Sequence, residues 1–346
     1  MAENSADQGN TFPWQPGTAT GIGSLPGTDP LAAARTVVTE LPDFPHLAEL
    51  PGRGPGADMI GRAAGLLVDI VVETTPRGWR LSPERPGKDM RRAKSLLSHD
   101  LDALEEVLDG YHGLLKVQVA GPWTLAAALE QPHSLKPALA DPGAVADLTA
   151  SLAEGLAAHV AEVAKRIPGA RLVVQLDEPG LPAAIEGTIP TPSGLSRVRA
   201  VDEEVIRARL RTVRTAVSQH YTVLHCCARA VPFGIIRGIG ADGVSFDLSL
   251  LGNAGLDALA ETAEAGLGLL VGAAPTTGPE RTPHKVALSV ADAWHRMGLP
   301  PATCAPQVVI TPACGLAGLS PAEAEATLRR VREAARILPE IMEERS

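Results

Sequence analysis

The sequence is poor in aromatic residues, in cysteine and in basic clusters, and each shortage excludes a class of protein. Aromatic residues make up 3% of the chain while hydrophobic residues make up 45%, so Ala, Leu and Val must fill the core. The net charge of -9, with no run of Lys or Arg, excludes a nucleic-acid-binding surface and a polybasic membrane patch. No segment has the roughly 20 consecutive apolar residues that span a bilayer. We therefore expect neither nucleic acid nor membrane as a partner.

Signals for export and for disulfide bonds are also missing. The first 17 residues are polar, contain Gly and Pro, and lack the basic-then-apolar layout of a signal peptide. We expect residues 1–17 to form a flexible tail. Four cysteines without an export signal indicate a reducing compartment, in which thiols persist or bind metal. The sequence thus predicts a cytoplasmic protein.

Short apolar segments that end in polar, Gly or Pro residues alternate with longer segments of helical periodicity. The predicted strands cover residues 18–22, 46–50, 114–119, 171–176, 221–226, 243–246, 267–271 and 307–310. The clearest predicted helices cover residues 142–165 and 202–218 and a final segment that Ser320 caps. Eight strand–helix units predict a single (β/α)8 TIM-barrel domain over residues 18–346. A doubly wound open sheet also alternates in this way, but it explains eight units less well.

Residue types that bind metal lie at the ends of three of the predicted strands. Side chains alternate along a strand, so His225 and Cys227 face one side while Cys226 faces the other. Imidazole nitrogen and thiolate sulfur are the usual ligands of zinc. Cys314 supplies a second sulfur just after the last predicted strand, and Asp247 supplies a carboxylate at the end of another. Three such ligands with one weak or displaceable fourth are typical of a catalytic zinc site.

The alternative is that these cysteines are buried hydrophobic residues without a metal. The His-x-Cys pair alone favours that alternative, and Cys314 in a Pro-Ala-Cys-Gly turn makes the two interpretations about equal. No motif surrounds Cys226 or Cys304, which we assign to the hydrophobic core.

Further motifs accompany this zinc pattern along the chain. They are Ile22-Gly23-Ser24-Leu25-Pro26, Asp58-Met59, Gly121-Pro122-Trp123-Thr124 and Gln175-Leu176-Asp177-Glu178-Pro179. With these motifs the sequence from Gly21 to Leu319 resembles the catalytic domain of cobalamin-independent methionine synthase. It is most similar to the short, single-barrel relatives found in archaea and actinobacteria.

The resemblance implies a zinc-dependent methyltransferase that moves a methyl group to a zinc-bound thiolate, with homocysteine as the acceptor and methionine as the product. The zinc ligands that it implies are His225, Cys227, Asp247 and Cys314. The methyl donor is 5-methyltetrahydrofolate in the long members of the family. Short relatives take the methyl group from a corrinoid, which a protein delivers in some cases, so the donor stays open.

The resemblance also assigns roles in substrate binding. Ser24 binds the carboxylate of the substrate, and Asp177 faces its amine as a counter-charge in the catalytic site. Trp123 lies near the place where the family binds its pterin. Stacking against the donor and simple packing under a loop are both open for Trp123.

Three positions depart from the family pattern. By register from Asp58-Met59, Arg53 stands where the family has a Glu that holds the homocysteine amine. Thr277 stands where long members have a His proposed as the proton donor, with His284 nearby as a possible substitute. Asp247 stands where Glu is the zinc ligand, and its shorter side chain implies a closer approach of the strand or a weaker fourth bond.

These departures motivate two alternative functions. Arg53 fits a thiol that carries a sulfonate, such as coenzyme M, better than it fits an amino acid. Thr277 and Asp247 motivate a non-catalytic relative that binds a metal or ligand. A nucleotide-dependent dehydrogenase is excluded, because the Gly-x-Gly-x-x-Gly pattern at 238–243 precedes a strand, whereas the dinucleotide fingerprint follows one.

Overall fold

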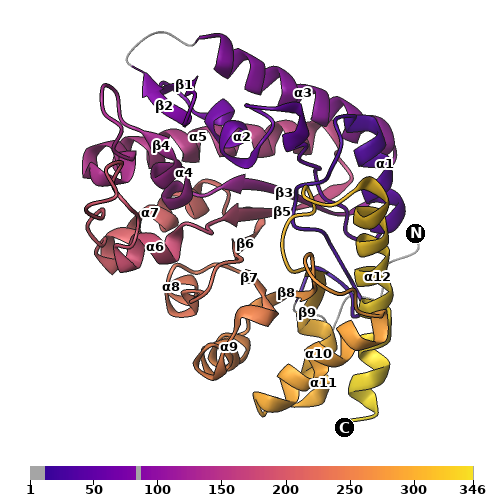
Figure 1. The fold of residues 1–346 in the computed structure, drawn as a ribbon. Coiled ribbons are helices and arrows are strands. Elements are labelled where there is room, and N and C mark those ends of the chain that lie inside the picture. Colours follow the sequence, from indigo (N-terminus) through magenta and orange to yellow (C-terminus); the bar gives the residue numbers. More distant parts are fainter. Residues whose placement is uncertain (1–11, 83–86, 346) are drawn as a thin grey trace.

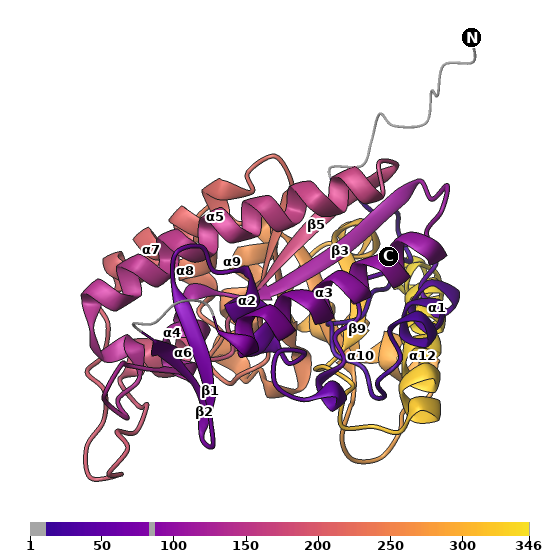
Figure 2. The same ribbon diagram turned by 90° about the horizontal axis from the view of Figure 1, so that it is seen from above.

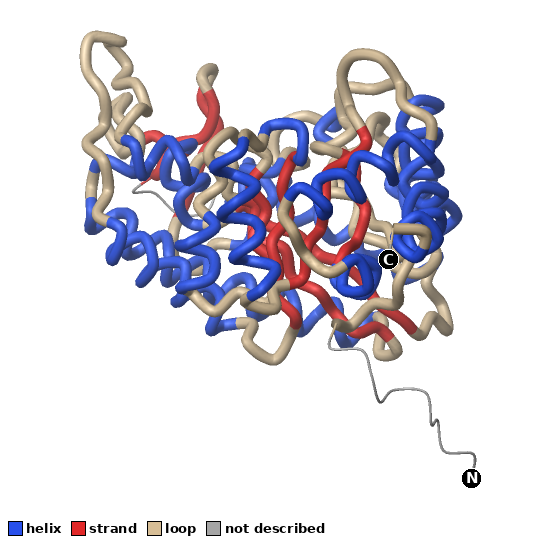
Figure 3. The backbone as a smooth tube through the Cα atoms, turned by 90° about the horizontal axis from the view of Figure 1, so that it is seen from below, coloured by secondary structure: helices blue, strands red, loops and turns tan. Residues whose placement is uncertain are grey.

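A parallel sheet of six strands forms the centre of the molecule, and helices cover its outside (Figures 1 and 3). The computed structural model describes residues 12–82 and 87–345. In spatial order the strands are β3 (Gly113–Ala120), β5 (Ala170–Asp177), β6 (Tyr221–Cys226), β7 (Gly243–Asp247), β8 (Gly268–Ala274) and β9 (Val308–Pro312). They confirm the last six predicted strands, with ends that differ by three residues at most. The fold class is therefore α/β.

Most helices follow a strand and return the chain to the start of the next one, as parallel pairing requires. They are α1 (Pro30–Glu40), α2 (Met59–Leu66), α3 (Lys88–Val107), α4 (Pro122–Ala128), α5 (Pro142–Arg166), α6 (Leu181–Glu186), α7 (Glu203–Ala216), α8 (Phe233–Gly238), α9 (Asn253–Glu264), α10 (Pro283–Arg296), α11 (Pro301–Gln307) and α12 (Pro321–Glu343). Helices α5 and α7 pack side by side, and α10 packs on α12 (Figures 1 and 2). Within the described ranges, no helix is both long and apolar enough to cross a membrane.

Short polar side chains fix where the main helices begin. Asp141 accepts hydrogen bonds from the backbone N–H groups of Gly143 and Ala144, which starts α5 with Pro142 at its first position. Ser320 and Glu323 form the predicted capping box at the start of α12. The predicted helix at 142–165 and the capped C-terminal helix are thereby confirmed.

The first two predicted strands, at 18–22 and 46–50, are not regular strands. These segments make isolated parallel bridges instead, which join Ala19 to Ile310, Ser24 to Glu49 and His46 to Lys116. A Cβ atom at Gly21 would lie 2.2 Å from Cε1 of His46. The two segments therefore lie too close together at this point to accommodate a side chain at position 21. The structure thus establishes a six-stranded sheet rather than a closed eight-stranded barrel.

A second, small sheet lies beside the main one and was not predicted. Strands β1 (Val71–Thr75) and β2 (Gly78–Ser82) form an antiparallel hairpin. Strand β4 (Leu129–Glu130) pairs with β2 in parallel. The hairpin projects from the body next to α2 and α4 (Figure 2).

The concave face of the main sheet is apolar at the amino ends of the strands and polar nearer their carboxyl ends. Its lowest layer is a cluster of inward side chains that includes Leu114, Val173, Val223 and Val309. Because side chains alternate with a period of two, Lys116, Gln175 and His225 point the same way one layer higher. All three are almost fully buried. Parallel strands thus direct buried polar groups towards the carboxyl ends, where α/β folds build their sites.

Trp14 closes the amino end of this apolar layer. It is 1% exposed, stacks on Phe12 and Phe44, and donates a hydrogen bond from Nε1 to the carbonyl oxygen of Pro306. Of the tail predicted at residues 1–17, residues 1–11 lie outside the described ranges. Residues 12–17 pack against the body through Trp14.

A buried histidine in α5 makes stability depend on pH. Burial and the charge of Arg62 lower the pKa of His159 to about 4 from its ordinary value of 6.5. The unfolded state binds a proton on His159 more tightly than the folded state does. The contribution of the neutral His159 to the free energy of unfolding is therefore complete above pH 6.5 and is lost as the pH falls towards 4. We expect His159→Gln to remove about 2 kcal/mol of the difference in unfolding free energy between pH 7 and pH 4.5. Urea unfolding of both proteins at the two pH values measures it, and an unchanged difference would contradict the assignment.

Candidate metal and substrate site

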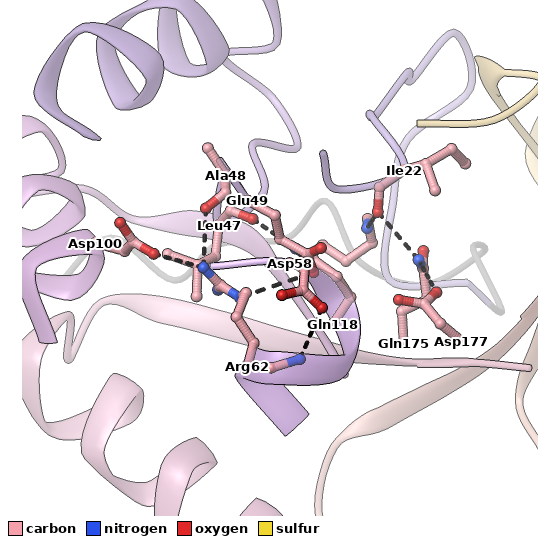
Figure 4. A network of polar contacts seen from close by, with 12 residues as sticks. Ile22, Leu47, Ala48, Glu49, Asp58, Arg62, Asp100, Gln118, Gln175 and Asp177 are labelled. Carbon is pink, nitrogen blue, oxygen red and sulfur yellow. Dashed lines mark hydrogen bonds and ion pairs between the residues drawn. The ribbon is translucent and has the colours of Figure 1, made fainter. Parts of the chain in front are cut away.

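Buried acids and one buried lysine line the upper part of the concave face. Asp177, the last residue of β5, is 5% exposed and accepts a hydrogen bond of 2.7 Å at Oδ1 from Nε2 of Gln175. Lys116 on β3 is fully buried, and its Nζ donates to the carbonyl oxygen of Ile22 at 2.6 Å. Figure 4 shows Gln175, Asp177 and Ile22 gathered at this point. The predicted catalytic acid therefore lies in a closed polar network.

Burial and mutual charge set the protonation of this network. Burial raises the pKa of Asp177 well above its ordinary value, the charge of Glu49 raises it further, and Lys116 opposes both. Burial also lowers the pKa of Lys116 to about 8, against the charges of Asp177 and Glu49. Two carboxyl groups face one lysine here, and a second cationic group, such as the amine of a substrate, would favour the ionised form of Asp177.

Glu49 is a site residue that sequence reasoning missed. It is 5% exposed, and its Oε1 accepts a hydrogen bond of 3.0 Å from Nε2 of Gln118 (Figure 4). The residue falls within a predicted strand, directly before the Pro/Gly-rich loop, so its place at a strand end was the available signal.

Arg53, which was predicted from register to lie in the substrate pocket, instead forms an ion pair with Asp100. Its guanidinium lies 2.6 Å from Oδ1 of Asp100 on α3. Arg62 of α2 contacts the other carboxylate oxygen of Asp100 at 2.5 Å. The structure therefore brings Glu49, and not Arg53, to Asp177. The turn Pro51–Arg53, a short 3-10 helix, carries Arg53 outward to Asp100.

Glu178 ties two strand ends together. It is fully buried, and its carboxylate accepts from the backbone N–H groups of Trp123 and Thr124 at 3.0 and 2.7 Å. Burial raises the pKa of Glu178 to about 7 against these hydrogen bonds. A Cβ at Gly121 would lie 2.4 Å from Oε1 of Glu178, which explains the glycine of the Gly-Pro-x-Thr element. The contacts give Glu178 a positioning role.

Trp123 offers no open aromatic face to this site. Its side chain is 1% exposed, and Nε1 donates to the carbonyl oxygen of Ile206 at 3.4 Å. The packing interpretation of Trp123 therefore describes the structure.

Two of the predicted zinc ligands meet. Sγ of Cys314, just after β9, lies within hydrogen-bond distance of Sγ of Cys227, just after β6, at 3.5 Å. That hydrogen bond lowers the pKa of Cys314 to about 6 and raises the pKa of Cys227. The negative charge of Asp177 also raises the pKa of Cys227, so the acid and the thiols are within electrostatic reach.

His225 and Asp247 come from the neighbouring strands β6 and β7. His225 is 3% exposed and shares a hydrogen bond of 2.9 Å between Nδ1 and Oγ of Ser245. Burial and the charge of Lys116 lower the pKa of His225 to about 3, so the imidazole is neutral at pH 7. Oδ1 of Asp247 accepts from the backbone N–H and the hydroxyl of Ser249 at 2.8 and 2.7 Å.

The thiol pair fits zinc better than the other two residues do. Two sulfurs at about 2.3 Å from a tetrahedral zinc lie about 3.8 Å apart, close to the 3.5 Å between Cys227 and Cys314. In the part of the chain that the structure describes, no three or more His, Cys, Asp and Glu side chains converge to hold a metal ion. His225 and Asp247 thus have suitable donor chemistry without being gathered on the thiols.

Ser24 lies beside the thiol turn. A Cβ at Gly315 would be 2.1 Å from Oγ of Ser24, and the N–H of Leu316 donates to the carbonyl oxygen of Ser24 at 2.8 Å. Thr277, which replaces the family's proton-donating His, and His284, the suggested substitute in the first turn of α10, are both exposed. A cavity of about 360 Å³ is lined by residues from the carboxyl ends of β7 and β8 and from the segment after β9, including Asp247, Gly272 and Ala313, but by neither thiol.

Comparisons with known proteins bear on the fold and the family of this chain. A B12-independent methionine synthase from Shewanella sp. W3-18-1, solved in complex with selenomethionine, is similar with a TM-score of 0.65 and 14% identity. The match covers 95% of this chain and 99% of that chain, and at this identity it bears on the fold alone.

A methylaspartate ammonia lyase from Clostridium tetanomorphum matches with a TM-score of 0.41 and 12% identity, over 94% of this chain and 60% of that one. That likeness is too low to carry an argument. A search of curated proteins found no match.

The family model described as the catalytic domain of cobalamin-independent synthase matches residues 136–337, which is more than half of the chain. The matched region contains Asp177, the thiol pair, His225 and Asp247. This chain belongs to the family of cobalamin-independent synthase catalytic domains.

Proposed function

We propose that the protein is a zinc-dependent methyltransferase that transfers a methyl group to the thiol of homocysteine and forms methionine. One observation supports this most directly: the Cys227 and Cys314 thiols lie 3.5 Å apart, within electrostatic reach of the buried Asp177. A sulfur pair suits zinc, and a buried acid suits the amine of an amino-acid substrate.

The proposed metal ligands are Cys227, Cys314, Nε2 of His225 and Asp247. The contact between Nδ1 of His225 and Ser245 resembles the way in which proteins orient a metal-binding imidazole through its second nitrogen. When bound, zinc lowers the pKa of an acceptor thiol, so that the thiolate predominates at neutral pH. Asp247 must release Ser249 or use its second oxygen to reach the metal.

Homocysteine fits the charges around the site better than a sulfonate-bearing thiol. Asp177 and Glu49 provide two carboxylates for an ammonium group, and both would repel a sulfonate. Arg53, which motivated coenzyme M as the alternative acceptor, is paired with Asp100. Ser24, beside the thiol turn, is proposed to bind the carboxylate of the substrate.

The methyl donor in this proposal is 5-methyltetrahydrofolate or a methylcorrinoid, with protein delivery open. The buried Trp123 does not favour stacking on a pterin, and the exposed Thr277 and His284 are not assigned as proton donors. Assay of both donors with homocysteine distinguishes them.

We also propose that residues 18–346 form one catalytic domain, a (β/α)8 barrel whose first two strands, at 18–22 and 46–50, pair only through single bridges. The single bridges from these segments to β9 and β3 support this. The four cysteines, all free in the described residues, support a reducing cytoplasm.

Metal analysis and X-ray absorption at the zinc edge test the proposed function. We expect one zinc per chain and one additional sulfur neighbour when homocysteine is added. Zinc that does not respond to homocysteine would favour another thiol. Stoichiometric zinc without turnover of any thiol, with either donor, would favour a non-catalytic relative. A protein purified without chelators that holds no zinc, and takes up none, would contradict the proposal.

Asp177→Asn tests the contact with the amine. Losing a charge-assisted interaction of 1.5–3 kcal/mol is expected to raise the KM for homocysteine about 10–100-fold, while zinc content stays the same. The KM for 4-mercaptobutyrate, which lacks the amine, should not change. An equal effect on both thiols would remove Asp177 from the amine site.

A further inference from the structure

A second cavity, separate from the thiol site, lies on the outer side of α4. Its volume is about 610 Å³, within the range of small-molecule pockets. Its walls come from α4, the start of α5, the 188–202 segment between α6 and α7, and the first turns of α7, which adjoin one another in Figures 1 and 2. Neither thiol, nor Asp177, nor His225 lines this cavity. An occupant of this space is therefore not the acceptor thiol.

Cationic side chains dominate the charge of the cavity. Lys136, Arg197, Arg199 and Arg209 line it, against one acid, Asp202. The carboxylate of Asp202 is already used, because Oδ1 accepts from the N–H of Glu204 as the N-cap of α7. The lining thus carries an excess of positive charge in a chain whose net charge is -9.

These cations are not neutralised by the protein. Among residues 12–82 and 87–345, no acid lies within ion-pair distance of any of the four, although many other arginines are paired. The guanidinium of Arg197 donates to the backbone carbonyl oxygen of Thr188. Nε of Arg209 is buried with no hydrogen-bond partner in the described structure. A buried guanidinium N–H without an acceptor is costly, and an anionic ligand would satisfy it.

The remaining walls of the cavity are apolar. Leu139, Val145 and Val198 line it and are each at most 6% exposed. Inorganic phosphate alone would leave this surface in contact with water. An apolar group attached to the anion would cover it and gain the free energy of burial.

We propose that this cavity binds a small organic anion, in which a carboxylate, phosphate or sulfonate is attached to an apolar body. The anionic group contacts Arg199 and Arg209, and the apolar body lies against Leu139, Val145 and Val198. None of the proposed zinc ligands lines this cavity, so binding here is measured without methyl transfer.

Fluorescence titration with 8-anilinonaphthalene-1-sulfonate tests the proposal, since this probe has both an aromatic body and a sulfonate. Its neutral analogue, N-phenyl-1-naphthylamine, lacks the sulfonate. We expect saturable binding of one sulfonate probe per chain. Affinity should fall at least about 10-fold in Arg199→Ala/Arg209→Ala, and also when NaCl rises from about 0.05 to 0.5 M. Binding of the neutral analogue should change less than about 2-fold.

Two further variants make the outcome specific. Arg199→Ala alone alters an exposed side chain, and it should weaken sulfonate binding even if the double variant folds poorly. Arg336→Ala removes the same charge from a different cavity, at the amino end of the sheet, and should have no effect. Non-saturable binding, equal losses for both probes, or an equal loss in Arg336→Ala would overturn the proposal.

Discussion

Cys227→Ser and Cys314→Ser are each expected to lower the rate of methionine formation at least about 1,000-fold, which corresponds to about 4 kcal/mol of activation free energy. Each change removes one sulfur of the pair that lies 3.5 Å apart, and a serine hydroxyl is a poor ligand for zinc. Zinc content should fall in parallel with the rate. Initial rates with homocysteine and the active donor, combined with elemental analysis of the same samples, measure both effects.

Cys304→Ala is the matched control for these two variants. Cys304 is a free, fully buried cysteine in α11, outside the carboxyl ends of the strands. Its replacement should leave zinc content unchanged and the rate within about 2-fold, even if some stability is lost. Full zinc and normal turnover in Cys227→Ser would contradict the proposed site.

The sequence predicted the parts of this site that depend on local alternation. Along β6, His225 and Cys227 were expected on one face and Cys226 on the other. In the structure His225 shares the concave face with Val223, while Cys226 is fully buried in the main core. The ends of the last six strands followed from where apolar segments meet polar residues. Both inferences need only the period of the strand.

The first two segments were harder to predict because their pairing depends on distant residues. Gly21 packs on the ring of His46, and Gly23 packs on Gln118, whose Nε2 would lie 2.9 Å from an added Cβ. Such close approaches replace a regular ladder with single bridges, and no local pattern in the sequence encodes them. The α/β class was therefore predicted correctly, whereas the predicted closed barrel of eight strands differs from the six-stranded sheet of the structure.

The sequence analysis assigned Arg53 to the substrate pocket and missed Glu49. This error also arose because the contacts of both residues depend on distant parts of the chain. A register counted back from Asp58-Met59 crosses a Pro/Gly-rich loop, in which the chain turns through Pro51–Arg53. The partner of Arg53, Asp100, is 47 residues away on α3. Only the tertiary structure shows that Asp100 holds this arginine while Glu49 turns towards Gln118.

Asp100→Ala is expected to lower the free energy of unfolding by about 3–5 kcal/mol, because it leaves two buried guanidinium groups without their counter-ion. Asp100 is 4% exposed and lies 2.6 Å from Arg53 and 2.5 Å from Arg62. Glu106→Ala on the same helix removes an exposed pair with Arg35 and should cost no more than about 1 kcal/mol. Equilibrium unfolding in urea compares the two variants, and similar small losses would show that Asp100 is not the anchor of this loop.

The same variant is expected to affect substrate binding. Because Arg62 also lies 3.9 Å from Glu49, we expect the unpaired Arg62 of Asp100→Ala to shift towards Glu49, compete with the substrate amine and raise the KM for homocysteine.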